Sequence, residues 1–336
     1  MAKIITYTTL LISIFILLIF IFFQNDKNET FKINPNKETI LYVFGHGYNK
    51  SGKIVRMDDN NIVKESKLYG ENLNALKSDG NRNYLWSVHN KKLVEIDHSL
   101  NLKENHVKKN DILFFDKKAD IEVIAYNIDT TKTTVEIKDG KHKVSKNFPP
   151  LVVNSLITDK KVYLYSDNMI NNLAVVYVYD RKNQSFEEIT LHNINASEMK
   201  LVKDNLVLTT ENELTVINTK TKDVNSYPLK NHQLFLNIGI INKEMYITYA
   251  EEGKIGVMKV SDKGTVNLDR SMPFRYYDSK VIGNKLYAIN IDEGKKIAYT
   301  MHIIDIKQWK VLKKYKIPHQ ENNLTDFDVI NKSSNA

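Results

Sequence analysis

The chain has 336 residues, no cysteine, and a formal net charge of +8 that lysine carries almost alone. The absence of cysteine excludes disulfides, thiolate metal sites and a cysteine nucleophile, so packing must hold the fold together. The basic residues are mixed with Asp and Glu and accompany no recognition helix or aromatic RNA-binding motif, which argues against a nucleic-acid partner. The lysines suit anionic polymers or lipid headgroups, and equally an ordinary solvated surface.

An uncharged apolar segment of twenty residues comes first, at residues 4–23. A helix of that length spans ~30 Å of hydrocarbon, and Phe22 to Asn25 offers no small-residue cleavage site. We therefore predict an uncleaved transmembrane signal anchor, with a cleaved signal peptide as the alternative. Residues 1–3 then form a short cytoplasmic N-terminus, and residues 24–38 form a tether.

The lysines that follow this segment, Lys27, Lys32 and Lys37, would by local charge counting favour the opposite orientation. However, an N-terminal apolar segment ordinarily leads a long domain out of the cytosol, whatever its local charge. We expect a single-pass protein of the cell membrane with its main domain on the extracytoplasmic side.

A repeat of about forty residues fills residues 39–332. Each copy holds an apolar strand of the Leu-Tyr-Val kind and a later strand that ends in Asp or Asn at a turn, and both landmarks recur every 38 to 44 residues. The first landmark begins at Leu41, Leu85, Val123, Val162, Leu206, Met245 and Leu286, and the second lies at Asp58, Asp97, Asp139, Asp180, Asn218, Asp262 and Asp305. Seven units of this length, each too small to bury a core alone, predict an all-β, seven-bladed β-propeller.

The fifth copy, from Met199 to Leu229, shows the unit most clearly. Four short segments rich in β-branched and aromatic residues are separated by three turns of Asn, Asp, Lys and Glu. This composition is typical of β-hairpins, and helical spacing fits it poorly.

The two ends of the repeat predict how the ring closes. The first copy begins at its second strand, Thr39 to Gly45, and lacks an innermost one. The tail Asp326 to Lys332 resembles Ser279 to Lys285, an innermost strand with its turn, so residues near Leu324 to Ile330 can supply the missing strand. We expect the C-terminal strand to complete blade one, which removes exposed sheet edges and favours a monomeric ring.

The connection Pro273 to Asp278, between blades six and seven, is the strongest candidate for ligand binding. Its residues Phe274, Arg275, Tyr276 and Tyr277 combine aromatic area with directional donors, as interface hot spots do. The alternative is that Phe274 and one tyrosine pack between blades. Such connections end beside the channel, on a face that ring-shaped proteins use for ligands.

Four histidines in predicted loops, His46, His192, His232 and His319, join these candidates for ligand or partner binding. A loop histidine is usually a solvated polar residue, but loops from different blades converge around the channel. If two of them meet a carboxylate there, a metal or acid/base site becomes feasible. No H-E-x-x-H pair occurs, so we predict neither a metal nor a cofactor.

Three shorter motifs are interpreted as turns. Gly47 to Lys53 spells G-x-x-x-x-G-K, but Ile54 replaces the Ser or Thr of a phosphate loop and a strand follows where a helix is required. Asp79 to Asn83 lacks the glycine and distal Glu of a calcium loop. Ser261 to Gly264 resembles a sialidase Asp-box without its flanking residues.

Two units, Leu214 to Val224 and His302 to Val311, resemble the V-I-D-T-x-T-x-x-V edge of YVTN-type bacterial surface propellers. This resemblance implies an extracytoplasmic binding or scaffolding role and carries over no active site. We therefore expect a module that binds a protein or a cell-envelope component through its channel face. The alternative is a lactonase-like or lyase-like propeller enzyme with a metal or acid/base site at the channel.

Overall fold

The structure is a computed structural model that describes most of the repeat region. It describes residues 38–45, 52–68, 73–79, 82–87, 91–97, 99–107, 111–129, 132–149, 151–168, 173–191, 196, 198–210, 213–229, 234–292, 298–318 and 323–330. The predicted anchor at residues 4–23 and the tether up to residue 37 lie outside this part. Within it, no helix is long and apolar enough to cross a membrane.

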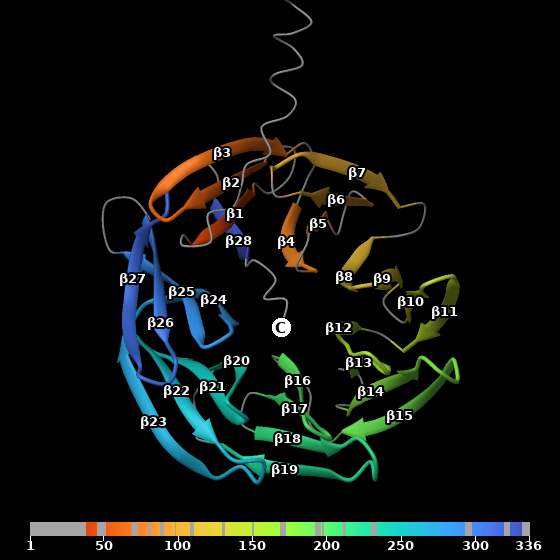
Figure 1. The fold of residues 1–336 in the computed structure, drawn as a ribbon. Helices are drawn as coiled ribbons and strands as arrows, with labels where there is room; N and C mark the ends of the chain where they lie inside the picture. Colours follow the sequence, from red (N-terminus) through yellow and green to blue (C-terminus); the bar gives the residue numbers. More distant parts are fainter. Residues whose placement is uncertain are drawn as a thin grey trace, which may run out of the picture.

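The described strands form seven antiparallel sheets of four strands, arranged as blades around one axis (Figure 1). From the centre outwards, blade 1 consists of β28 (Asn323–Ile330), β1 (Thr39–Gly45), β2 (Gly52–Asp58) and β3 (Asn61–Leu68), and blade 2 of β4 (Leu73–Ser78), β5 (Asn83–Ser87), β6 (Lys92–Ile96) and β7 (Leu102–His106). Blade 3 consists of β8 (Ile112–Lys118), β9 (Ile121–Asp129), β10 (Lys132–Asp139) and β11 (His142–Phe148), and blade 4 of β12 (Val152–Ile157), β13 (Lys161–Asn168), β14 (Leu173–Asp180) and β15 (Ser185–Leu191). Blade 5 consists of β16 (Glu198–Val202), β17 (Asn205–Thr209), β18 (Glu213–Asn218) and β19 (Val224–Pro228), and blade 6 of β20 (Leu234–Ile241), β21 (Glu244–Glu251), β22 (Lys254–Val260) and β23 (Val266–Pro273). Blade 7 consists of β24 (Tyr276–Ile282), β25 (Lys285–Asp292), β26 (Ala298–Asp305) and β27 (Lys310–Lys316). The predicted all-β, seven-bladed propeller is confirmed.

The predicted ring closure is also confirmed. Strand β28 pairs antiparallel with β1, from Thr39 opposite Ile330 to Gly45 opposite Asn323. Blade 1 is therefore built from both ends of the repeat region. The chain reaches the innermost strand of this blade only after it has passed through all the other blades. The pairing of that strand with β1 therefore closes the ring.

The outermost strand of each blade is its most exposed strand. Strand β1, second from the axis, is buried at every position, because neighbouring blades cover both of its faces. The outermost β3 and β27 are mostly exposed and rich in lysine. This gradient explains the sequence pattern: continuous apolar runs mark strands covered on both faces, and charged strands mark the rim.

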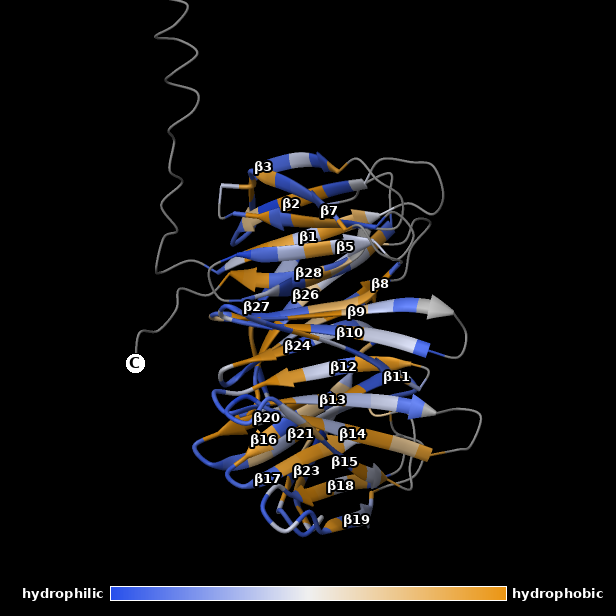
Figure 2. Cartoon of the chain, turned by 90° about the vertical axis from the view of Figure 1, so that its right-hand side faces the viewer, coloured by the Kyte–Doolittle hydropathy of each residue, from blue (hydrophilic) through white to orange (hydrophobic). Residues whose placement is uncertain are grey.

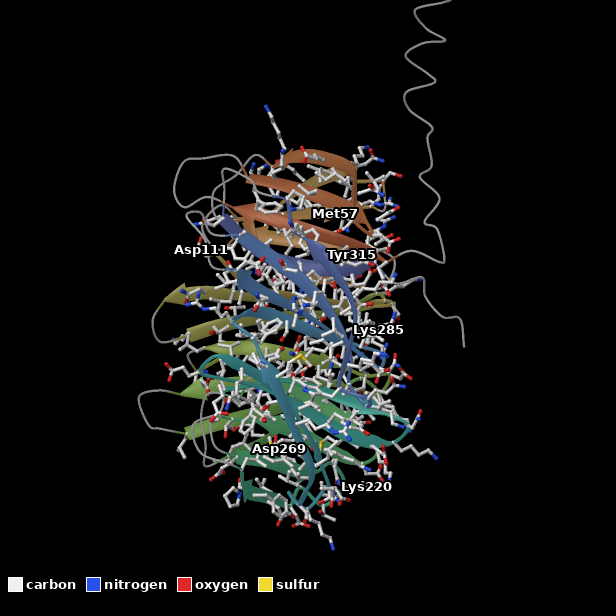
Figure 3. The ribbon with its side chains drawn as sticks, turned by 90° about the vertical axis from the view of Figure 1, so that its left-hand side faces the viewer. Met57, Asp111, Lys220, Asp269, Lys285 and Tyr315 are labelled. Atoms are coloured by element: carbon white, nitrogen blue, oxygen red, sulfur yellow. The ribbon has the colours of Figure 1, made fainter. Side chains whose placement is uncertain are left out.

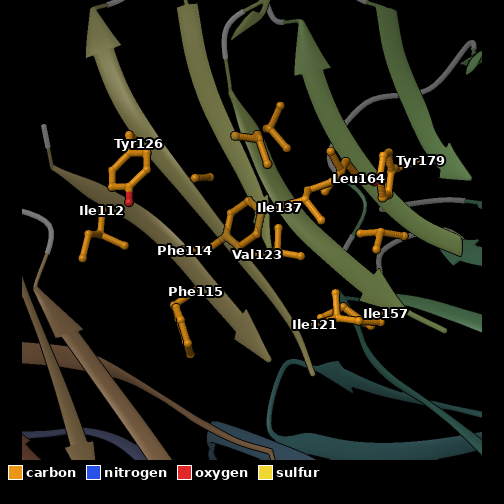
Figure 4. Close-up of a cluster of buried hydrophobic side chains, with 14 of the residues drawn as sticks. Ile112, Phe114, Phe115, Ile121, Val123, Tyr126, Ile137, Ile157, Leu164 and Tyr179 are labelled. Atoms are coloured by element: carbon orange, nitrogen blue, oxygen red, sulfur yellow. The ribbon is translucent and has the colours of Figure 1, made fainter. Parts of the chain in front are cut away.

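Clusters of buried apolar side chains fill the junctions between adjacent blades. At the closing junction, Tyr42 and Met57 of blade 1 pack with Tyr287 and Met301 of blade 7. Figure 3 labels Met57 and Tyr315 in this region. At the junction of blades 3 and 4, residues such as Val123 and Leu164 pack together (Figure 4). The core is thus distributed around the ring, as expected for blades that cannot bury a core alone.

The two faces of the ring differ in their connections. One face, here called the turn face, carries the short turns that join the first strand of a blade to the second and the third to the fourth. The other, here called the loop face, carries the connections between second and third strands and those between blades. Figure 2 shows the ring from the side, with mostly hydrophilic turns along one face. Both Glu38, which precedes β1, and Ile330 lie on the turn face, because Thr39 pairs with both Asp58 and Ile330.

Of the three motifs interpreted as turns, residues 261–264 form a turn, in which the Gly264 N–H donates to the Ser261 carbonyl oxygen at 3.1 Å. Residues 47–51 and 80–81 of the other two motifs lie outside the described residues; the backbone N–H of Arg82 donates to Asp79 Oδ1 at 2.8 Å. Gly264 has a φ of 73°, and a Cβ placed on it would lie 2.2 Å from the Cβ of Tyr227 in blade 5. A glycine is required there by both the backbone conformation and the neighbouring blade.

Truncation of Phe327 to alanine should weaken the ring closure. Phe327 lies on β28, is fully buried, and packs in the cluster that joins blades 7 and 1. We expect Phe327→Ala to lower the free energy of unfolding by roughly 3–5 kcal/mol, as large-to-small changes in cores do. Urea denaturation followed by circular dichroism measures this. Leu312→Ala, at a side chain that is 45% exposed on β27, serves as the control and should change stability little. Equal unfolding midpoints for the two variants would contradict the closure role.

Candidate functional site

Charged and polar side chains gather on the innermost strands, around the central channel. We call this set the channel belt, and it consists of Lys77, Asp116, Ser155, Glu198, Lys200, Asn237, Asp278, Lys280, Asp326 and Asp328. Seven of the ten line a channel cavity of 620 Å³ that reaches from blades 1 and 2 to blades 5, 6 and 7. Polar residues concentrated at the centre of an apolar ring mark this region as the candidate site.

A β-bulge at the same place in six blades positions these side chains. Innermost strands β28, β4, β8, β12, β20 and β24 each skip one residue in their pairing with the second strand. The skipped residues are Thr325, Asn74, Leu113, Val153, Leu236 and Tyr277. A bulge re-aims the side chains that follow it. Asp326, Asn154, Asn237 and Asp278 come directly after a bulge, and Lys77, Asp116, Lys280 and Asp328 come two residues later.

The belt links neighbouring blades through hydrogen bonds and ion pairs. Between blades 7 and 1, Lys280 Nζ lies 3.0 Å from Asp326 Oδ1. Asp326 Oδ2 in turn accepts a 2.7 Å hydrogen bond from the backbone N–H of Leu76 in blade 2. Lys280 Nζ also donates to the carbonyl oxygen of Leu76 at 3.3 Å, so its ammonium reaches across blade 1. The closing strand is therefore held from both sides by polar contacts as well as by packing.

The same arrangement continues around the channel. Lys77 of blade 2 lies 2.9 Å from Asp116 of blade 3, which accepts a 2.6 Å hydrogen bond from Ser155 Oγ of blade 4. The backbone N–H of Ile238 in blade 6 donates to Glu198 of blade 5. Asn237 Nδ2 donates to Ser279 Oγ of blade 7 at 2.8 Å. Many of the belt's charges are thus used to join blades.

Two acidic groups of the belt, Asp278 and Asp328, have raised pKa values. Burial, reinforced by the nearby charge of Asp326, raises the pKa of Asp278 from 3.8 to about 6. Burial likewise raises the pKa of Asp328. Burial alone would lower the pKa of Lys280, but Asp326 and Asp328 outweigh it and raise that pKa. The belt therefore contains a carboxyl group that exchanges its proton close to neutral pH, beside a lysine that stays charged.

The four predicted residues at 274–277 occupy different environments. Phe274 is 4% exposed and packs edge-on against His302, with ring centroids 5.1 Å apart, in the apolar junction of blades 6 and 7. Tyr276 is half-buried against the same junction. Tyr277, a bulge residue, packs 4.9 Å from the ring of Tyr299 and donates its hydroxyl hydrogen to the carbonyl oxygen of Leu324 in blade 1. Arg275 is exposed on the loop face, and its backbone N–H donates to Asn290 Oδ1 at 2.8 Å.

The four predicted histidines, His46, His192, His232 and His319, lie outside the described residues. Within the described residues, no group of three or more His, Asp or Glu side chains is arranged to hold a metal ion. The role of the histidines and of residues 274–277 in binding stays a prediction.

Most of the channel belt was not predicted from the sequence, although a signal for it exists. Three innermost strands carry pairs of charged residues two positions apart: Asp278 and Lys280, Glu198 and Lys200, and Asp326 and Asp328. Charge at alternate positions of a strand covered on both sides indicates a polar lining at the axis. This pattern can be recognised in the sequence only when it is known which strand of each unit is innermost.

Comparisons with known proteins agree with the fold and leave the function open. No family model matches the chain. The uncharacterized protein YeeG of Bacillus subtilis is 24% identical over 234 residues, which cover 68% of this chain and 67% of that protein. Among solved structures, cobalt-substituted apocarotenoid oxygenase of Synechocystis matches with a TM-score of 0.59 and 9% identity, covering 88% of this chain and 93% of that one.

Two further solved structures represent other propellers. Apo AztD from Citrobacter koseri matches with a TM-score of 0.53 and 10% identity, covering 87% of this chain and 98% of that one. The β-propeller domain of Cps50 (Swd1) from Myceliophteria thermophila matches with a TM-score of 0.55 and 11% identity, covering 75% of this chain and 89% of that one. At such identities the likeness shows the propeller fold alone.

Replacement of Asp278 by asparagine should remove a pH-dependent loss of stability. Because its pKa is about 6 in the folded chain and 3.8 ordinarily, the folded state binds more protons than the unfolded state between those pH values. Stability from this group is therefore highest below pH 3.8 and falls as the pH rises from there through about 6, by about 3 kcal/mol in total. Asparagine keeps the acceptor that receives the Ser279 N–H at 2.7 Å. We expect Asp278→Asn to be more stable than wild type in urea at about pH 7.5 and nearly equal at about pH 3.5, below the unfolded pKa. A variant that is less stable at both pH values would contradict this.

Proposed function

We propose that the protein is a membrane-anchored, extracytoplasmic β-propeller that binds a protein or a cell-envelope component through its loop face. The observation that carries this proposal is that both ends of the closed ring lie on the turn face. A tether that enters on one face leaves the other unobstructed. The resemblance to YVTN-type surface propellers belongs to the same proposal.

We infer the orientation of the ring relative to the membrane from the face at which the chain enters it. Glu38 is fixed to blade 7: its carboxylate accepts a hydrogen bond from Tyr287 at 2.7 Å and pairs with Lys285. Lys285 lies on the turn face, as Figure 3 shows, whereas Asp111 lies on the opposite side. If residues 4–23 span the membrane, the short tether holds the turn face toward it. The loop face, with Arg275 beside the channel mouth, then points away from the membrane.

Where blade 6 connects to blade 7, the loop face carries residue types that are common in binding surfaces. Arg275 is exposed directly before innermost strand β24, and the half-buried rings of Tyr276 and Tyr277 follow it. Arg and Tyr are enriched among residues that dominate binding energies at interfaces. Because Phe274 is buried, Arg275 and the two tyrosines are the part of the predicted site that can contact a partner.

Cross-linking from a single introduced cysteine tests the proposal, and the chain suits it because it has no cysteine of its own. Arg275→Cys keeps the backbone contact to Asn290 and places a thiol on the loop face. Lys220→Cys places one on the turn face, at a side chain that is 72% exposed (Figure 3). Each variant is labelled on cells with benzophenone maleimide and irradiated. We expect a discrete cross-linked species from position 275 and none from position 220.

The same two variants test the topology. A membrane-impermeant maleimide added to intact cells should label both thiols, because both faces are expected outside the cytosol. Labelling that requires broken cells would contradict the extracytoplasmic assignment. Cross-links of equal yield from positions 275 and 220, or from neither, would contradict binding through the loop face.

The pKa of Asp278 favours a second candidate, an enzyme with an acid/base site in the channel. A carboxyl group with a pKa of about 6, beside Asp326 and Lys280, matches what general acid–base catalysis needs near neutral pH. Hydrolysis of a panel of lactones, measured for wild type and Asp278→Asn, separates the two candidates. Turnover that disappears in the variant supports the enzyme, and the absence of turnover in wild type leaves the binding module.

A further inference from the structure

A second recess, separate from the channel belt, opens between blades 2 and 3 and has a volume of 640 Å³. It forms where a small blade meets a large one. Strands β5, β6 and β7 have five residues each, whereas β9, β10 and β11 have nine, eight and seven. Blade 2 is thus too short to cover the whole facing side of blade 3. We call this recess the 2–3 cleft.

The side of blade 3 that faces the cleft carries charge where other blades carry apolar residues. Strand pairing places Lys117, Glu122, Lys138 and Lys143 in one row across all four strands, and all four line the cleft. At the closing junction, by contrast, the facing residues of blade 1 are Ile40, Tyr42, Val55 and Met57 among others. Packing between blades does not require this row of charge.

The row contains an unfavourable pair. Lys138 and Lys143 lie directly opposite each other on β10 and β11, and like charges in that position destabilise a sheet. Lys143 is neutralised by Glu136 at 2.9 Å. Lys138 is exposed and lies between Lys143 on β11 and Glu122, which is directly opposite it on β9. An anion bound beside Lys138 would offset the part of this repulsion that Glu122 and Glu136 leave.

The floor of the cleft combines aromatic rings with carboxylates. Tyr84 and Phe115 lie with ring centroids 4.8 Å apart, and both line the cleft together with Tyr126. Figure 4 shows Phe115 and Tyr126 on one side of blade 3 and Leu164 beyond the other. Glu136 is only 7% exposed yet still borders the cleft, and Glu122 lies between two lysines of the row. Carboxylates in this position can accept hydrogen bonds from a ligand but repel a simple anion.

From this arrangement we propose that the 2–3 cleft binds an acidic saccharide. The carboxylate or phosphate group of the sugar lies between Lys138 and Lys143, where charge-assisted hydrogen bonds are the strong ones. Its hydroxyl groups, which both donate and accept, meet Glu122 and Glu136 on one side and Lys117 on the other. A neutral sugar would bring no charge to offset the repulsion between Lys138 and Lys143, and a bare anion would face the carboxylates of Glu95, Glu122 and Glu136. The site is independent of the proposed partner surface at Arg275.

Calorimetric titration of the full-length protein, in a detergent without a sugar headgroup, tests the assignment. The probes are tetragalacturonate and glucose 6-phosphate as acidic sugars, maltotetraose as a neutral sugar and inorganic phosphate as a bare anion. We expect the acidic sugars to bind, with an affinity that falls as sodium chloride is added. Lys138→Gln and Lys143→Gln should each weaken binding roughly tenfold or more, since each removes a hydrogen bond to a charged group.

Lys220→Gln, at an exposed lysine of blade 5, is the matched control and should bind like wild type. The urea midpoint of Lys138→Gln should stay close to that of wild type, because the change removes one like-charge pair and one opposite-charge pair across the strands. Equal binding of maltotetraose or of phosphate, binding unaffected by Lys138→Gln, or no binding of either acidic sugar would each overturn the assignment. None of these outcomes bears on cross-linking from position 275, so the two proposals fail separately.

Discussion

The pairing of β28 with β1 is the contact on which the rest of the structure depends. Each blade packs only against its neighbours, so the ring has no single central core to hold it closed. The pairing supplies the missing strand of blade 1, places Phe327 in the apolar junction with blade 7, and brings Asp326 between Lys280 and the backbone of Leu76. Backbone pairing, apolar packing and ion pairing therefore coincide at one strand.

The channel belt stabilises the ring across its blade junctions. Polar contacts that cross blade junctions fix the inner strands relative to one another. The repeated bulge sets the direction of the side chains that follow it. Asp278 is the exception, because its carboxyl group is destabilised as a carboxylate and gains little from the blades around it. A group held in an unfavourable charge state beside a cavity is a common property of functional sites.

Much of the fold could be predicted from the sequence, because the repeat rests on local signals. Apolar runs mark strands buried on both faces, and Asp, Asn and Gly mark the turns, so blade number and closure follow without knowledge of distant contacts. The positions of side chains relative to the channel could not be predicted in the same way. A bulge of one residue changes which side chains face the axis. The residue types of Leu113 and Val153 do not indicate that these positions are skipped in the strand pairing.

The candidate site shows the same limit. Phe274 and Arg275 are adjacent in a short connection, yet the first is buried against His302 and the second is exposed. Whether an aromatic residue in a loop packs or projects depends on the neighbouring blade, which sequence spacing does not describe. The row of lysines facing the 2–3 cleft likewise appears only once strand register places residues 117, 138 and 143 side by side.

The closure also constrains the order in which the molecule can assemble. Thr39 and Ile330, which pair in the finished ring, are about 290 residues apart in the chain. Contacts of such high sequence separation slow folding, because loop entropy must be lost before they form. Strand β1 is among the first parts of the domain to be synthesised, and every one of its residues is buried in the end. The face of β1 that carries Ile40, Tyr42 and Phe44 packs against blade 7 and β28, so it stays uncovered until the end of the chain arrives. The interval before closure is therefore the period of greatest exposure to aggregation and to proteases.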